Sequence, residues 1–430
     1  MEILLIGNGF DLEHKLPTSY IDFLRFCEHI RKIYFYNESE TVQEYKTENL
    51  DTWEINSYIK DLLFETFQNR ICTERKQKDD SYIVEISTPN QMLNELNSLL
   101  HDNTWLDYFL NCYSYIGENW IDFESEISNV IQALDSGRFQ IENGGSIKNV
   151  EGHDGELLVS IWKASKKNMQ QIYKDVNAID KFVDFLNKEL ERLIRALEIY
   201  LSGIVHNIPV DNKSPDVEKI HPDHILSFNY SDTYTRVYGK GEHIEYNYIH
   251  GKAELSKTLE TCNMVLGIDE YLDEDEKDSE LTFLFFKKYY QRIYKSTDNV
   301  YLLWIDEIRQ EYIDYVAKTG FECTSKYKPF RSTSLQERIH IKTPQYRYPE
   351  HNLYIFGHSL DVTDKDVLKK LICNDNVQTK IFYYRKHEND KSSLAKLIKN
   401  LIKIMGQDEL IRRTGGVYQT IEFIPQTIIK

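Results

Sequence analysis

The chain has 430 residues but only six cysteines, and no two of them form a C-x-x-C pair. The absence of such pairs excludes a recognisable zinc ribbon, and we predict reduced thiols, no bound metal and a cytoplasmic protein. No stretch of eighteen apolar residues occurs, so no membrane-spanning helix is expected. The first apolar run is short and follows an acidic residue, which is not the pattern of a signal peptide.

Basic residues are outnumbered, with 52 Lys and Arg against 69 Asp and Glu and a formal net charge of −17. Non-specific binding of nucleic acid depends on clustered positive charge, so a nucleic-acid partner is not expected. Hydrophobic residues make up 41% of the chain and aromatic residues 13%. That composition is too apolar for a disordered protein and predicts a globular fold.

Short apolar runs typical of β-strands occur at the start of the chain and again in its C-terminal half. They span residues 3–6, 224–228, 245–249, 264–266, 353–356 and 380–384. Residues 26–220 show instead the three-and-four spacing of amphipathic helices, most clearly over 92–100 and 182–201.

Strands interleaved with helices predict an α/β fold. We expect its core to combine residues 1–25 and 221–430, with residues 26–220 as a large helical insertion. The polar segments 140–155 and 269–280 are predicted to be surface loops.

The most informative local pattern is Gly7-Asn8-Gly9-Phe10-Asp11-Leu12, directly after the first apolar run. Two glycines there permit a tight turn and the close approach of a ligand, and the N-terminus of a following helix can hold phosphate. Leu12 replaces the third glycine of the dinucleotide-binding fingerprint. The motif therefore fits either a nucleotide-binding loop or a plain strand-to-helix turn.

Polar clusters also follow three later strands, at 227–232, 250–251 and 357–361. After the last of them, Thr363 and Asp364 are placed to cap a helix. Each cluster has a plain structural explanation, such as an Asx turn or a packed histidine. If the strands are parallel neighbours, however, their carboxyl ends meet at one edge of the sheet. The residues expected to face one crevice are then Asn8, Asp11, Asn229, Asp232, His250, His358 and Ser359.

Residues 5–12 and 16–20 resemble the opening of the AbiH family of bacteriophage abortive-infection proteins. Later motifs of that family resemble residues 227–233, 248–251, 267–269 and 356–364. The resemblance implies a role in defence against phage and spans both ends of the chain.

The same positions resemble, more distantly, the NAD-binding core of sirtuins and of sirtuin-like phage-defence effectors. Residues 7–17 keep the spacing of their Gly-Ala-Gly-x-Ser loop, and Asn229 stands where the asparagine of their Thr-Gln-Asn-Ile-Asp motif lies. His250 with Gly251 resembles the catalytic His-Gly pair, and residues 357–360 resemble the Gly-Thr-Ser-Leu motif. The resemblance implies a Rossmann-like (sirtuin-like), mainly parallel sheet that binds NAD⁺.

This sequence departs from the sirtuin pattern at three points. Asp11 replaces the serine of the first loop, Asp232 follows Asn229 by three residues instead of two, and the zinc-binding cysteines of deacetylases are missing. Protein deacetylation is therefore not expected. The resemblance to the defence effectors implies an abortive-infection protein that cleaves the nicotinamide–ribose bond of NAD⁺ without an acyl-lysine acceptor.

That cleavage passes through an oxocarbenium-like state, and its cationic leaving group needs no general acid. Asn229 and Asp232 would stabilise the cation and orient water, and His250 would act as general base because histidine titrates near working pH. The residues expected to bind the nucleotide are Gly7, Asn8, Gly9, Phe10, Asp11, Gly357, His358 and Ser359. The expected partners are this small-molecule nucleotide, a phage-derived trigger and further copies of the chain.

Two other classes of function stay open from the sequence. In a metal-dependent nuclease, Asp122 and Glu126 would hold Mg²⁺ from one helix face, although the same spacing suits a solvent-facing stripe. Residues 283–295 mix aromatic and basic side chains, as strand-binding surfaces do, although most such runs are amphipathic helices with buried aromatics. A non-catalytic nucleotide sensor would use the same strand-end crevice as the enzyme.

Overall fold

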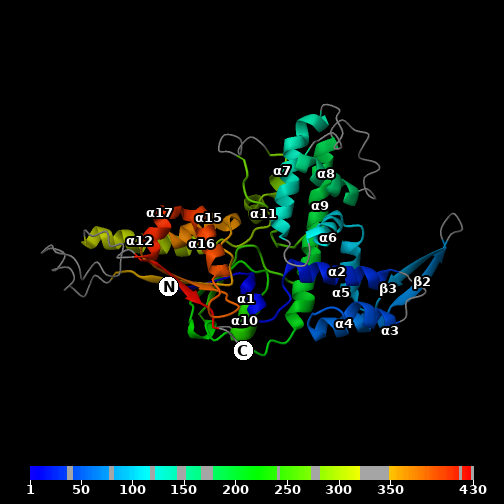
Figure 1. Ribbon diagram of the computed structural model, residues 1–430, viewed down its shortest axis with the longest axis horizontal. Helices are drawn as coiled ribbons and strands as arrows, with labels where there is room; N and C mark the ends of the chain where they lie inside the picture. The colour runs from blue at the N-terminus through cyan, green and yellow to red at the C-terminus, as the bar shows by residue number, and fades with distance from the viewer. Residues whose placement is uncertain are drawn as a thin grey trace. The chain divides into compact units, whose positions relative to one another are not determined.

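The computed structural model describes residues 1–35, 42–76, 82–116, 122–142, 152–165, 178–239, 243–272, 281–319, 348–415 and 419–427. The chain forms two compact units (Figure 1). The first, which we call the sheet unit, consists of residues 1–16, 210–251 and 297–430. The second, which we call the helical unit, consists of residues 17–209 and 252–296.

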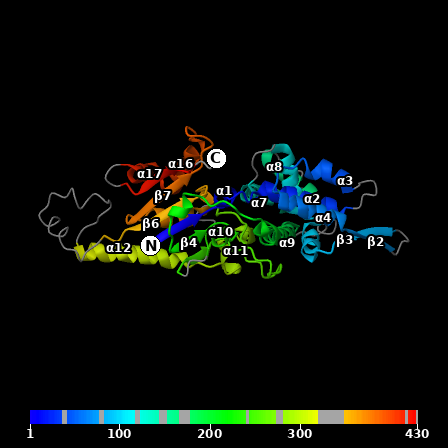
Figure 2. The ribbon, with the colours of Figure 1, turned by 90° about the horizontal axis from the view of Figure 1, so that it is seen from below.

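The sheet unit is built on a six-stranded sheet in which all neighbouring strands are parallel. In spatial order the strands are β5 (Glu245–Tyr248), β4 (His224–Ser227), β1 (Glu2–Ile6), β6 (His351–Phe356), β7 (Val377–Tyr383) and β8 (Ile421–Pro425). Figure 2 shows β6 and β7 beside each other. The prediction of an α/β fold with a mainly parallel sheet is confirmed.

Side chains of β1 alternate between the two faces of the sheet, as the strand period of two requires. Ile3 and Leu5 join one hydrophobic cluster, and Leu4 and Ile6 join another. The first cluster also contains residues of α12 (Tyr301–Thr319), α15 (Lys365–Ile372), α16 (Ser392–Met405) and α17 (Gln407–Thr414). The second contains residues of α1 (Asn8–Glu13), α10 (Thr233–Tyr238) and the 3-10 helix η6 (Val217–Lys219). Apolar residues therefore cover both faces, as is usual for parallel sheets.

The path of the chain reverses at β1. From this central strand the chain adds β4 and β5 on one side, and it then returns to add β6, β7 and β8 on the other. In open α/β sheets, ligands bind outside the carboxyl ends of the strands at such a reversal. The turns that follow Ile6 and Phe356 are therefore the first place to look for a functional site.

One predicted strand is wrong. Met264, Val265 and Leu266 are buried as expected, but they belong to no strand. Leu266 N donates to Gln291 Oε1 at 3.0 Å, and Gln291 Nε2 donates to Leu266 O at 3.1 Å. The side-chain amide of Gln291 thus forms the hydrogen bonds with the Leu266 backbone that a neighbouring strand would otherwise have formed.

Three strands were not expected from the sequence. An antiparallel hairpin of β2 (Ile71–Lys76) and β3 (Tyr82–Ser87) lies within the segment predicted to be helical, and β8 completes the sheet. Residues 140–142 and 152–155 of the first predicted loop are helical, and residues 143–151 lie outside the described part of the chain. Of the acidic segment 269–280, residues 273–280 also lie outside it.

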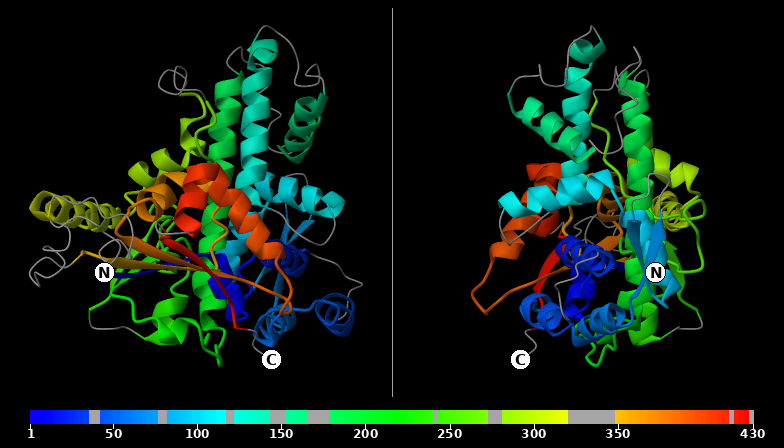
Figure 3. Two further views of the ribbon diagram at one scale, coloured as in Figure 1. Left: turned by 60° about the vertical axis from the view of Figure 1, so that its left-hand side comes forward. Right: turned by 90° about the vertical axis from the view of Figure 1, so that its right-hand side faces the viewer.

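Most of the helices that the structure describes belong to the helical unit. They are α2 (Tyr20–Tyr34), α3 (Val42–Tyr45), α4 (Ser57–Gln68), α5 (Gln91–Leu100), α6 (Thr104–Ile116), α7 (Phe123–Glu142), α8 (Gly152–Ser165), α9 (Ala178–Ile199) and α11 (Lys288–Tyr294). α9 is the long green helix of Figure 3, and it buries the apolar stripe that the sequence predicted. Trp105 of α6 donates its indole N–H to Leu186 O of α9 at 2.8 Å. Within the described ranges, none of the helices combines the length and apolar character that crossing a bilayer requires.

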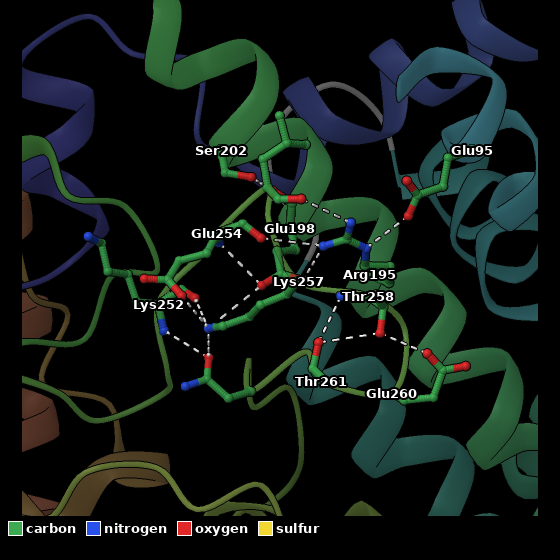
Figure 4. A network of polar contacts seen from close by, with 12 residues as sticks. Glu95, Arg195, Glu198, Ser202, Lys252, Glu254, Lys257, Thr258, Glu260 and Thr261 are labelled. Atoms are coloured by element: carbon green, nitrogen blue, oxygen red, sulfur yellow. Dashed lines mark hydrogen bonds and ion pairs between the residues drawn. The ribbon is translucent and has the colours of Figure 1, made fainter. Parts of the chain in front are cut away.

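A buried ion-pair network attaches the segment after β5 to α9 (Figure 4). Arg195 is 1% exposed, and its Nη1 donates to Glu198 Oε2 at 2.7 Å. The same guanidinium lies 3.4 Å from the carbonyl oxygens of Glu254 and Leu255. Residues 252–296, which the sequence had placed with the core, accordingly pack in the helical unit. The helical unit also includes residues 17–25, and the sheet unit includes residues 210–220.

Candidate functional site

The turn after β1 brings two glycines against the loop that follows β6. Gly7 N donates to Phe356 O at 3.1 Å, and Gly9 N donates to Gly357 O at 2.7 Å. A Cβ added to Gly7 would lie 2.7 Å from His358 Cα, and one added to Gly9 would lie 2.8 Å from Gly357 Cα. Both positions therefore require glycine because two backbones pass in direct contact.

Three N–H groups of this turn are engaged within the protein. Gly7 and Gly9 donate to the loop after β6, and Phe10 N donates to Gly7 O at 2.8 Å. These bonds stabilise the turn in its present form. A nucleotide at this edge would have to contact the exposed side chains of Asn8 and Ser359, which flank the turn.

Asn229 joins the end of β4 to the turn after β1. Ser227 Oγ accepts from Asn229 N at 3.1 Å and donates to Asn229 O at 3.0 Å, which closes a tight loop at the strand end. Asn229 Nδ2 donates to Gly7 O at 3.0 Å, and the residue is 5% exposed. The Asn229 side chain therefore does not form the Asx turn that the sequence left open: a serine-based turn ends the strand, and the amide of Asn229 holds the neighbouring strand end.

Asp11 is a buried carboxyl group at the same edge. The residue is 2% exposed, and burial raises its pKa to about 6, against the opposing effect of the Ser231 and Thr233 hydroxyls and the charge of Arg236. Ser231 Oγ donates to Asp11 Oδ2 at 2.6 Å, whereas Oδ1 is buried with no hydrogen-bond partner among the described residues. A buried acid whose pKa lies near working pH is a typical feature of functional sites.

Asp11→Asn is expected to stabilise the protein at pH 8 by about 3 kcal/mol and to change its stability by only about 1 kcal/mol at pH 4.5. The folded-state pKa of about 6 exceeds the unfolded value, so wild-type stability falls as pH rises from about 4 to 6 and then levels off. Because asparagine is neutral at every pH, the Asp11→Asn variant does not lose this stability. Urea unfolding across this pH range measures it. Ser231→Ala, which removes a donor to the carboxylate, should have the opposite sign at pH 8, and an Asp11→Asn variant that is less stable than wild type there would contradict the expectation.

Asp364 lies between two histidines that come from different strands. His250 follows β5, and its Nε2 lies 3.3 Å from Asp364 Oδ1. His358 follows β6, and its Nε2 lies 3.5 Å from Asp364 Oδ2. The Phe228 ring packs edge-on against both imidazoles, with centroid distances of 5.5 and 4.4 Å. The three polar side chains are at most 10% exposed, so this cluster is part of the protein interior.

The residues predicted for the site fall into a buried set and an accessible set. The buried set is Gly7, Phe10, Asp11, Asn229, His250 and His358. The accessible or half-buried set is Asn8, Gly9, Asp232, Gly357 and Ser359. Contacts between the four strand ends bring the buried set together. Ser359 lies beside them, with its carbonyl oxygen held by Asn400 Nδ2 of α16 at 2.9 Å.

Sequence reasoning missed the role of Asp364, which it interpreted as a helix cap. Asp364 does stand at the N-cap position of α15, but its side chain makes no capping bond there, whereas Asp361 caps the preceding 3-10 helix η8 (Val362–Asp364) by accepting from Thr363 N at 3.3 Å. It also missed Ser231, which contacts Asp11. Ser231 stands inside one of the polar clusters noted above and Asp364 follows another, but nothing in their spacing shows which side chains meet across the sheet.

The carboxylates proposed for a nuclease have structural roles. Asp122 Oδ1 accepts from Glu124 N at 3.1 Å and Oδ2 accepts from Ser125 Oγ at 2.9 Å, so Asp122 caps α7. Glu126 Oε2 accepts from Tyr108 OH at 3.2 Å. Over the described ranges, no group of three or more His, Cys, Asp or Glu side chains is arranged to hold a metal ion.

The aromatic and basic segment 283–295 has an unexpected distribution of burial. Phe283 and Phe286 are buried, but so are two lysines: Lys287 pairs with Glu270 at 2.7 Å, and Lys288 pairs with Glu124 at 2.8 Å. Ile293 and Tyr294 are more than 70% exposed. Because the charges are used internally, the segment does not offer the positive surface that strand binding requires.

The family model for bacteriophage abortive infection AbiH matches residues 3–384, which include β1, β4, β5, β6 and all of the strand-end residues above. The chain belongs to the AbiH family. No curated protein and no solved structure matches the chain. Membership of this family supports a role in abortive infection during phage attack.

Most of the segments that resemble AbiH motifs lie at the strand-end site of this AbiH-family chain. Residues 5–12, 227–233, 248–251 and 356–364 end four adjacent strands and supply the glycine turn, the asparagine, both histidines and Asp364. Residues 267–269 lie in the helical unit. The family resemblance is therefore concentrated at one edge of the sheet.

Proposed function

We propose that this AbiH-family protein binds NAD⁺ at the carboxyl edge of its sheet and cleaves the nicotinamide–ribose bond during phage infection. The observation that carries the proposal is the topology. Numbered within the sheet, the strands are ordered 3-2-1-4-5-6, which is the order of the Rossmann dinucleotide-binding fold, and the glycine turn stands at the reversal point. Fold alone does not determine reaction, so the site residues carry the rest of the argument.

The residues at the edge fit a nucleotide in three respects. Gly9 and Gly357 are half-buried, so part of the backbone of the two turns is accessible to a ligand. The exposed side chains of Asn8 and Ser359 can donate hydrogen bonds to phosphate oxygens. Half-buried Asp232 supplies a negative charge, which would stabilise a developing ribosyl cation.

The proposed step is a hydrolysis. The bond between C1′ and the nicotinamide nitrogen breaks, and its electron pair neutralises the pyridinium. Water attacks C1′, and His250 accepts the proton that water loses. The products are nicotinamide, ADP-ribose and one proton.

Nicotinamide release by the purified protein tests the proposal, with and without lysate from phage-infected cells, because we also propose a phage-derived trigger. His250→Ala is expected to reduce the rate by about 10²–10⁴-fold, the usual contribution of a general base. Asn229→Ala should also abolish release, since it removes the bond that holds the glycine turn. His101→Ala is the matched control, because that ring is 71% exposed in the helical unit and should leave the rate unchanged.

Calorimetry with NAD⁺ separates the possible failures. Binding of NAD⁺ without release of nicotinamide, with or without the lysate, would indicate a nucleotide sensor instead of an enzyme. Absence of both binding and release would overturn the assignment of NAD⁺. Light scattering on the triggered and untriggered protein tests the further proposal that the active form is a homo-oligomer.

A further inference from the structure

The segment 281–296 directs its charged side chains into the helical unit. The ammonium groups of three lysines, each with a side chain at most 5% exposed, form ion pairs with acids from three different parts of this unit. The pairs are Lys287 with Glu270 at 2.7 Å, Lys288 with Glu124 of α7 at 2.8 Å, and Lys295 with Glu191 of α9 at 2.7 Å. Removing an ammonium group from water has a large cost in free energy, which a carboxylate partner offsets.

Apolar side chains take the exposed positions of the same segment. We call five of them, in and just before α11, the apolar face: Phe285, Tyr289, Tyr290, Ile293 and Tyr294. Ile293 and Tyr294 are 74% and 73% exposed, and Tyr290 is half-buried. The Tyr290 ring contacts the rings of Phe285 and Tyr294, with centroid distances of 5.4 and 5.8 Å. These rings hold one another in place, so little conformational entropy is lost when a partner covers them.

The apolar face has no exposed charge beside it in this segment. Residues 281–296 are all described, and the other exposed positions among them are Leu281 and Ser296. Amphipathic surface helices usually show the reverse arrangement, with charged side chains in water and apolar ones inside. An exposed apolar surface of this kind typically marks a site of interaction.

The charge of the chain indicates which partner fits the apolar face. Anionic lipids and nucleic acids are held by exposed Lys and Arg, whereas the cationic side chains of this segment are buried. Two copies of the chain, each with a formal net charge of −17, repel each other over most of their surface. In an isologous contact a surface meets its own copy, so a charged surface would meet a like-charged one. A face without charge avoids that repulsion.

We propose that the apolar face is the contact surface of an isologous dimer, in which it packs against the same face of a second copy of the chain. At these exposures the five side chains offer roughly 450 Å² per copy, or about 900 Å² in the dimer. A polar rim of ordinary size brings the total to the roughly 1,200 Å² at which specific interfaces begin. The proposal specifies the homo-oligomer that forms part of the proposed function, but it does not depend on NAD⁺ cleavage. Because the face is already exposed in the structure, association requires no phage component.

Sedimentation velocity of the purified full chain, without NAD⁺ or lysate, tests the dimer over a range of concentrations. We expect a dissociation constant in the micromolar range or below. Association should strengthen from about 0.05 to 0.5 M NaCl, because salt screens the repulsion between the two copies. Ile293→Glu should raise the dissociation constant at least about tenfold, because it places an unpaired charge in the contact. Since Ile293 is so exposed, the variant should keep the circular dichroism spectrum of the wild type.

Leu303→Glu is the matched control. Leu303 lies on α12 of the sheet unit and is 66% exposed, so this substitution introduces the same charge at an exposed apolar position outside the apolar face. Its dissociation constant should stay within about threefold of the wild-type value.

A mixture of two variants tests the isologous geometry. Ile293→Lys alone should be impaired like Ile293→Glu, since both copies again bring the same charge to the contact. Equal amounts of the two variants should associate at low salt, because the acidic face of one copy then meets the basic face of the other. Added salt should weaken this mixed dimer, which is the opposite of its effect on the wild type.

Four results would overturn the proposal. A wild-type chain that stays monomeric at about 100 µM lacks the contact. A dimer that Ile293→Glu and Tyr294→Glu both leave intact uses another surface. A mixture of the two Ile293 variants that associates no better than either alone shows that the contact is not isologous. A monomeric chain that floats with phosphatidylcholine vesicles, and no longer does so as Ile293→Glu, would assign the apolar face to a membrane. None of these measurements involves nicotinamide release, so failure of the proposed reaction would be a separate result.

Discussion

Gly357→Ala is expected to lower the free energy of unfolding by about 2–5 kcal/mol, from two separate causes. Gly357 has φ of 70°, and an alanine in the left-handed region costs about 1–2 kcal/mol. The added Cβ would also lie 2.1 Å from Phe10 N and 2.5 Å from Gly9 C. One of the two loops then has to move, which adds about 1–3 kcal/mol. Urea titration followed by circular dichroism measures the loss.

Gly239→Ala separates the two causes. Gly239 also has a positive φ, of 88°, but an added Cβ there would have no neighbour within 4 Å. Its ψ of 167° places it in a region that is populated essentially by glycine, so its replacement should cost only the backbone contribution, here about 1–3 kcal/mol. Equal losses for the two variants would show that the loops at the strand ends are not crowded, contrary to the structure.

Glu198→Ala is expected to destabilise the helical unit by about 3–5 kcal/mol, because it leaves Arg195 buried without its main counter-charge. Glu198 is fully buried and accepts from Arg195 Nη1 at 2.7 Å and from Glu254 N at 3.2 Å. The substitution removes the partners of both donors (Figure 4). Thermal or urea unfolding of the full chain gives the difference.

Two comparisons make this expectation specific. Glu95→Ala removes the other carboxylate that contacts Arg195, but its side chain is 46% exposed, so the loss should stay below about 1 kcal/mol. Replacing both buried partners with apolar residues, Arg195→Met with Glu198→Leu, should cost less than Glu198→Ala alone. A double variant that is less stable than the single one would show that the pair contributes net stability beyond mutual neutralisation.

The sheet could be predicted because its signal is local. The strands near 3–6 and 224–228 are short apolar runs that end in polar residues, and parallel strands buried on both faces leave that pattern. The predicted strand at 264–266 has the same pattern and is wrong, because Gln291 provides its hydrogen bonds through a side chain. Hydropathy indicates which residues are buried, but it does not indicate which groups form hydrogen bonds with their backbone.

The sequence predicted which strand ends form the candidate site, but it did not predict which side chains contact one another there. Topology brings Asn229 and His250 to one edge, and topology can be inferred from the order of the strands. The pairing of His250 with Asp364 depends on side-chain geometry over residues 114 positions apart in the printed sequence. Gly7 and Gly9 are a different case. They fit a ligand-binding motif, but they are also required where the turn after β1 packs against the loop after β6.

The central position of β1 affects how the protein folds while it is being synthesised. Its neighbours are β4 and β6, and the register of the second pair joins Leu5 to Ile355. At about 5–20 residues per second, roughly 20–70 s separate the appearance of these two strands at the ribosome. The helical unit, which ends at residue 296, has been made by then, and until β6 appears the apolar residues 3–6 have only β4 as a neighbouring strand. Pairing over so large a separation is slow, and the edge of β1 that later binds β6 stays unpaired, and so open to aggregation, until most of the chain has been made.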